Sequence, residues 1–90
     1  MLFRSYFISG EINTKLASMD LVPAKLTEIA AKYSDGHQYE LDGISVEYPD
    51  WHFNVRPSNT EPLLRLNLES LVSREDMERK RDHVLALIRS

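Results

Sequence analysis

The stretch Phe53-Asn54-Val55-Arg56-Pro57-Ser58-Asn59-Thr60-Glu61-Pro62-Leu63-Leu64-Arg65 places a polar loop between two apolar runs. The apolar residues that recur at every second position are Trp51, Phe53 and Val55 before the loop, and Leu64, Leu66 and Leu68 after it. A period of two is typical of a strand with one buried face. The sequence therefore predicts two strands joined by this loop.

The residues before this stretch add a strand, a helix and a hairpin. A strand is expected around Phe7–Leu16, and Pro23 suits the first turn of a helix. The residues that form one apolar face of this helix are Val22, Leu26, Ile29, Ala30 and Tyr33. Two further strands, Gln38–Leu41 and Ile44–Tyr48, flank Asp42-Gly43, a pair typical of two-residue hairpin turns.

The residues after the stretch predict a final helix. Ser73 is three residues before Asp76, the spacing of a capping box. The apolar stripe of this helix consists of Met77, Val84, Leu85 and Ile88. The order β-α-β-β-β-β-α predicts an α+β fold: a four- to five-stranded antiparallel sheet covered on one face by two helices.

The loop itself concentrates donors that suit a phosphate. Arg56 offers a planar fork of N–H groups to an oxyanion. Ser58 and Thr60 add hydroxyl groups, and Asn59 adds an amide. From these residues alone, an anion site competes with an ordinary loop in which Arg56 pairs with Glu61 or another surface carboxylate.

Three motifs, in order along the chain, resemble one enzyme family. The loop Arg56-Pro57-Ser58-Asn59-Thr60 resembles the phosphate-binding loop of the α-D-phosphohexomutases, and closely that of the phosphomannomutase/phosphoglucomutase group. Tyr6-Phe7-Ile8-Ser9-Gly10-Glu11-Ile12-Asn13 is similar to the start of that family's last domain. Asp42-Gly43-Ile44-Ser45-Val46-Glu47-Tyr48 is similar to its hairpin before the loop. Together the motifs cover almost the whole chain.

The resemblance implies a TATA-box-binding-protein-like fold and a substrate-binding role. In the family this loop grips the non-transferred phosphate of a hexose phosphate, while the enzyme interconverts the 6-phosphate and the 1-phosphate. The implied ligands are mannose or glucose 1- and 6-phosphate and the bisphosphate intermediate. Asn59, where glucosamine-type members commonly have glycine, favours the mannose/glucose group.

The resemblance also assigns roles to single residues. It implies that Arg65 is a second arginine for the same phosphate, whereas its strand position alone is that of a solvated sheet residue. Glu61 is expected either to orient an arginine or to hold amides of the loop. The Ser9-Gly10 pair is a plausible hinge towards the rest of an enzyme, because glycine absorbs backbone rotation at little steric cost.

The catalytic parts of the family are expected elsewhere. The phosphoserine of the first domain and the Mg²⁺ ligands of the second have no matching motif in this chain. We therefore expect residues 1–90 to form a single domain, the C-terminal domain of a four-domain enzyme, without catalytic residues, metal ligands or a cofactor of its own. The alternative is a stand-alone module that binds another phosphometabolite without catalysis.

Composition excludes several other classes. The 90 residues contain no cysteine, which excludes disulfides and thiol catalysis and is compatible with the cytoplasm. The sequence contains no run of about 18 apolar residues, so no membrane span is indicated. The formal net charge of −3 disfavours broad binding to nucleic acid or to anionic membranes. Any anion site must therefore be local.

Overall fold

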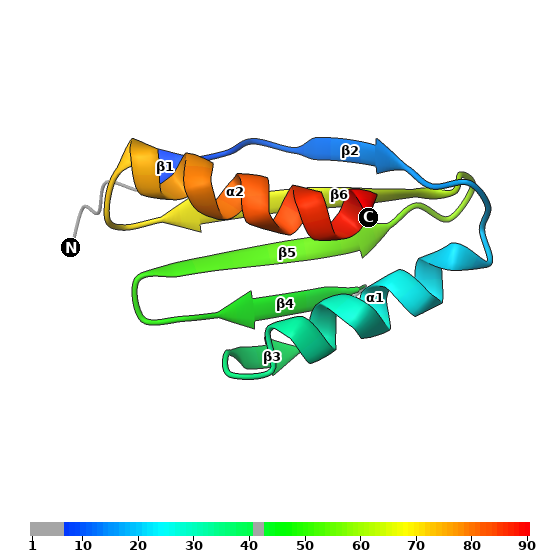
Figure 1. The fold of residues 1–90 in the computed structure, drawn as a ribbon, viewed down its shortest axis with the longest axis horizontal. Coiled ribbons are helices and arrows are strands. Elements are labelled where there is room, and N and C mark those ends of the chain that lie inside the picture. The colour runs from blue at the N-terminus through cyan, green and yellow to red at the C-terminus, as the bar shows by residue number, and fades with distance from the viewer. Residues whose placement is uncertain (1–6, 41–42) are drawn as a thin grey trace.

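The computed structural model describes residues 7–40 and 43–90, which form one antiparallel sheet and two helices (Figure 1). The elements are β1 (Phe7–Ile8), β2 (Ile12–Lys15), α1 (Leu21–Lys32), β3 (His37–Tyr39), β4 (Ile44–Glu47), β5 (Trp51–Pro57), β6 (Leu63–Ser70) and α2 (Arg74–Arg89). The predicted order of strands and helices is confirmed, except that the first strand is divided into β1 and β2.

Strands β5 and β6 form the centre of the sheet. The strand order is β1-β6-β5-β4-β3. Strand β2 is not part of this path, but it also pairs with β6. Both helices lie over the same face of this sheet, so the other face is left without a helix (Figure 1). The predicted α+β class is confirmed. The sheet has six strands because the interrupted edge contributes two short ones.

Alternate residues of the central strands build the core. Phe53, Val55, Leu66 and Leu68 point to the helix-covered face and are at most 1% exposed. The helix residues buried against them include Val22 and Ile29 of α1 and Met77, Val84, Leu85 and Ile88 of α2. The predicted apolar stripes are therefore the faces that pack on the sheet. Among the described residues, neither helix combines the length and the apolar character that a membrane span requires.

The edge strand breaks at Ser9 and Gly10. Gly10 has a φ angle of 76°, a conformation that glycine adopts readily. Ser9 is nevertheless held to β6, because its N–H donates to the Leu68 carbonyl at 2.9 Å and its Oγ accepts from the Leu68 N–H at 3.0 Å. These bonds attach Ser9 to β6 within this domain, and the expected hinge at Ser9-Gly10 stays a prediction.

The β3–β4 connection differs from the expected two-residue turn. Tyr39 pairs with Ser45, which leaves five residues between these partners. A two-residue turn would leave an even number between any two paired residues. Leu41, the end of the predicted strand, and Asp42, the first residue of the predicted turn, lie outside the described residues.

Ser73 caps α2 as predicted, but the capping box is only half formed. The Ser73 Oγ accepts from the Asp76 N–H at 3.0 Å. The Asp76 carboxylate does not return this bond. It accepts from the buried Ser70 hydroxyl at 2.7 Å and from the Lys80 ammonium at 2.7 Å. Asp76 therefore fastens the first turn of α2 to the end of β6.

Candidate functional site

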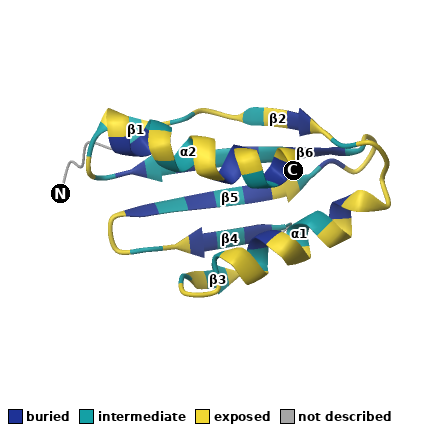
Figure 2. Ribbon diagram, viewed as in Figure 1, coloured by how far each residue is buried: buried dark blue, intermediate teal, exposed yellow. Residues whose placement is uncertain are grey.

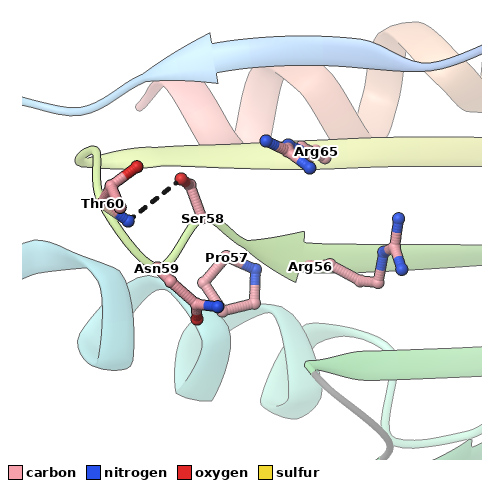
Figure 3. A pocket seen from close by; sticks show the side chains of 6 residues that line it. All are labelled: Arg56, Pro57, Ser58, Asn59, Thr60 and Arg65. Atoms are coloured by element: carbon pink, nitrogen blue, oxygen red, sulfur yellow. Dashed lines mark hydrogen bonds between the residues drawn. The ribbon is translucent and has the colours of Figure 1, made fainter.

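The β5–β6 loop and the ends of its two strands surround a cavity of about 550 Å³ (Figure 3). Its lining residues are Arg56, Pro57, Ser58, Asn59, Thr60 and Arg65. All five residues expected to bind phosphate therefore lie around one space. Pro57, which was not among the expected ligands, is an additional part of the wall.

Ser58 organises the loop from within. Its side chain is buried, and its Oγ accepts the backbone N–H groups of Thr60 and Glu61, each at 3.3 Å. Serine makes such local bonds because its short side chain reaches the backbone two or three residues ahead. The hydroxyl still has its single proton, which it can donate to a ligand.

The end of the loop is fastened to both neighbouring strands. The Ser58 N–H donates to the Leu63 carbonyl at 3.2 Å, which closes the loop at its base. The Leu16 N–H donates to the Pro62 carbonyl at 2.6 Å, and the Leu63 N–H donates to the Glu61 carbonyl at 2.8 Å. These bonds leave the backbone of the loop little freedom at its base.

The Glu61 side chain lies outside the cavity. It is exposed, and among the described residues it forms no ion pair with Arg56 or Arg65. Of the two roles expected for Glu61, orienting an arginine is therefore not seen. Its backbone N–H and carbonyl do take part in the bonds that shape the loop.

Arg56 and Arg65 are direct cross-strand partners on β5 and β6. Directly opposite residues have Cβ atoms about 4.5–5.5 Å apart, and like charges in such positions repel each other. Figure 3 shows both side chains on the cavity side, with the Arg56 guanidinium extending along β5 away from the loop. The structure thus brings together two cations that are nine residues apart in the sequence.

The two arginines lack a carboxylate partner in the described part of the chain. No ion pair within residues 7–40 and 43–90 includes either of them. The Arg65 Nε is buried and has no hydrogen-bond partner among these residues. A buried donor without a partner is costly. An oxyanion between the guanidinium groups would satisfy this donor and relieve the repulsion.

Gly43 supports the site from the neighbouring strand, a role the sequence did not reveal. A Cβ at this position would clash with the Val55 carbonyl and would lie 2.9 Å from the Arg56 Cα. Its φ angle of 141° is also one that other residues rarely adopt. Only glycine lets β4 start this close to the backbone that carries Arg56.

The histidines lie away from this cavity and do not form a metal site. His52, on the helix-free face of β5, is 3.5 Å from the Glu69 carboxylate. Within the described residues, no group of three or more His, Cys, Asp or Glu side chains has the arrangement to hold a metal ion. The candidate site therefore consists of cationic and neutral donors, which suit an anion.

Comparison with known proteins agrees with this chemistry. The family described as phosphoglucomutase/phosphomannomutase, C-terminal domain, matches residues 11–87. A phosphomannomutase of Escherichia coli is 45% identical over 83 residues, which is 90% of this chain and 18% of that protein. A phosphomannomutase of Methanocaldococcus jannaschii is 47% identical over 68 residues, 76% of this chain and 14% of that protein.

A third relative has a broader name. Phosphohexose mutases of Xanthomonas campestris pv. campestris are 42% identical over 84 residues, 90% of this chain and 18% of theirs. The chain thus spans 14–18% of the length of the curated relatives it matches. Because the family match covers most of the 90 residues, this chain belongs to the phosphoglucomutase/phosphomannomutase C-terminal domain family.

Proposed function

We propose that this chain is the substrate-phosphate-binding domain of a longer phosphohexomutase. The observation that carries the proposal is the pair of opposed arginines, Arg56 and Arg65, which lack a carboxylate partner in the described residues. Ser58, Asn59 and Thr60 complete the same cavity with neutral donors. This set can surround a phosphate with charge-assisted and neutral hydrogen bonds.

The loop would hold the phosphate that is not being transferred. The longer enzyme would interconvert a hexose 6-phosphate and a hexose 1-phosphate, with mannose or glucose as the sugar and the bisphosphate as intermediate. Binding energy from a remote phosphate can position the reacting end of a substrate. The relatives named phosphomannomutase support this substrate class.

The reacting groups would lie in other domains of the longer enzyme. We assign the phosphoserine and the Mg²⁺ implied by the family resemblance to those domains, because this sequence has no motif that matches either of them. This chain would supply binding and orientation, and no proton or phosphoryl transfer. We accordingly predict that the pure 90-residue chain has no mutase activity. We also propose that the longer enzyme is cytoplasmic.

A titration of the 90-residue chain with inorganic phosphate tests the site. One wall of a cleft should bind weakly, with a dissociation constant of about 1 mM or more, or roughly −4 kcal/mol. In NMR spectra the amides of Ser58, Asn59 and Thr60 should move first, and an Arg56→Gln variant should lose these shifts. Largest shifts on the two helices would show that the site is wrongly assigned.

A gene-length measurement separates this proposal from its alternative. A four-domain mutase needs several hundred residues. A natural chain that ends at this one domain and still binds phosphate would instead be a stand-alone module for a phosphometabolite.

A further inference from the structure

A second polar row lies beside the two arginines on the helix-free face of the sheet. Two residues back along β5 from Arg56 is Asn54, and two residues on along β6 from Arg65 is Asn67. Asn54 and Asn67 are themselves cross-strand partners, and Ser45 of β4 pairs with Asn54 on its other side. We call Ser45, Asn54 and Asn67 the amide row. Because residues two apart share a face, it lies on the same side as the arginines.

The side chains of this row are prepared for further hydrogen bonds. The Asn54 Nδ2 donates to the Ser45 Oγ at 2.8 Å and to the Ile44 carbonyl at 3.3 Å. With its two N–H groups used, the Asn54 amide presents its carbonyl oxygen as an acceptor. Asn67 is half-buried, and its side chain has no hydrogen-bond partner among the described residues.

The position of the row suits the body of a sugar. Two residues along a strand span about 6.7 Å, which is of the order of the distance from an ester phosphate across a hexose ring. The Arg56 guanidinium extends along β5 away from the loop (Figure 3). Asn54 lies two residues back along the same strand. A ligand whose phosphate lies between the arginines can therefore lay its ring on the sheet.

The chemistry of the row suits neutral hydroxyl groups. An amide and a hydroxyl together offer both donors and acceptors, as vicinal sugar hydroxyls do. The next positions along the same face are occupied by Glu47, His52 and Glu69. The amide row is thus a neutral band between the two arginines and a row that contains two carboxylates, those of Glu47 and Glu69.

We propose that the amide row is a subsite for the hydroxyl groups of a phosphosugar, with Asn67 as its principal contact. The inference rests on the proposed function, because it requires a phosphate at Arg56 and Arg65. It adds that the amide row of the sheet recognises the sugar hydroxyl groups, whereas the loop alone would bind any phosphate monoester.

Two monoesters of equal charge separate these contributions. Methyl phosphate and glucose 6-phosphate would each be titrated into the 90-residue chain and followed by NMR. Both should move the amides of Ser58 to Thr60, while glucose 6-phosphate should also move the side-chain NH₂ signals of Asn54 and Asn67. Its affinity should exceed that of methyl phosphate by about threefold to tenfold, the range of one or two neutral hydrogen bonds.

Variants of the row test the assignment. Asn67→Ala should reduce the affinity ratio of the two ligands by about threefold and leave methyl phosphate binding unchanged. Glu47→Gln, one pleat further along the same face, is the matched control and should keep the ratio. If Asn67→Ala does not fold, Asn54→Ser tests the same row.

Each result bears on one of the two proposals. Equal affinities for both monoesters, or an unchanged ratio in Asn67→Ala, overturn the amide-row subsite while the phosphate site stands. If neither ligand moves the loop amides, the proposed function fails and the subsite falls with it. Glucose without phosphate should not bind measurably, and the same shifts with glucose alone would show that the row works independently of the arginines, against the proposal.

Discussion

The two faces of strands β5 and β6 differ completely in chemistry although their residues alternate in the sequence. On the helix-covered face, Val55 and Leu66 are cross-strand partners and are fully buried. Figure 2 shows the alternation of buried and intermediate residues along β5. One position along on each strand, Arg56 and Arg65 are also partners, but they face the side without a helix. Burial stabilises the first pair, and like charge destabilises the second.

This difference indicates what each face contributes. The covered face supplies the stability that holds the strands in register, and the open face uses that register to place two cations together. A binding site built in this way carries a small cost in folding free energy that the core must offset. Substitutions on the two faces should therefore have opposite patterns of effect on stability and binding.

The largest expected effect is a loss of stability from Phe53→Ala on the covered face. Phe53 is 1% exposed. The centroid of its ring is 5.0 Å from that of the Tyr33 ring, in an edge-to-face contact. Truncation of a buried phenylalanine costs about 3–5 kcal/mol, through lost burial and a residual cavity. Urea unfolding measures this loss.

The control for Phe53→Ala lies on the opposite face of the neighbouring strand. Asn67→Ala should change the free energy of unfolding by about 0.5 kcal/mol or less. Similar losses from both substitutions would contradict the assignment of stability to the covered face.

The next largest effect is expected at Asp76, a buried polar residue in the first turn of α2. The hydrogen bond from Lys80 and that from Ser70 lower the pKa of its carboxyl, and the charges of Lys80 and Arg79 add to this. Asp76→Ala removes charge-assisted bonds and should cost about 1.5–3 kcal/mol at neutral pH. Urea unfolding at pH 7 checks this value.

Asp76 should also make stability depend on pH. Because its pKa is lower in the folded chain than its unfolded value of about 3.9, its contribution is present above that value. The contribution should be lost as the pH falls below about 4 and through the folded pKa. Asp76→Asn should lack this component, and an equal acid response in both proteins would contradict the role of Asp76.

On the open face, Arg56→Lys should impair binding without affecting folding. Lysine keeps the charge but loses the planar fork that holds two phosphate oxygens. Loss of one charge-assisted bond corresponds to about 1.5–3 kcal/mol, or roughly ten- to a hundredfold in binding. In a full-length enzyme with this domain, catalytic efficiency should fall alike for every hexose phosphate. A variant that loses one sugar while keeping another would contradict a pure phosphate contact.

The sequence predicted the covered face more completely than the open one. A period of two identified Phe53, Val55 and Leu66 as core residues because burial of alternate side chains leaves a regular pattern. The open-face pairing of Arg56 with Arg65 depends on register across the loop, which no local pattern contains. Only the resemblance to a family grouped these two residues beforehand.

Other differences between the predicted and the observed structure have the same physical origin. The break at Gly10 and the odd register between Tyr39 and Ser45 are set by pairing with partner strands. Asp76 had the spacing of a capping residue, yet its carboxylate bonds to Lys80, one turn further along α2, and to Ser70, which comes close only where β6 meets α2. Tertiary partners thus decided what local sequence left open.

The smallest expected effect is a gain, and it distinguishes the two faces most directly. Arg65→Gln removes one of two opposed like charges, keeps part of the side-chain stem, and should raise stability by about 0.2–1 kcal/mol at low salt. Arg65→Lys retains the repulsion and is the control. With phosphate at about ten times its dissociation constant, the wild-type chain should gain about 1.4 kcal/mol, whereas Arg65→Gln should gain much less. The order of stabilities should therefore reverse between phosphate-free buffer and saturating phosphate, as read from urea midpoints. A variant that is less stable than wild type in both buffers would mean that Arg65 serves the fold, and the contrast between the two faces would not hold at this position.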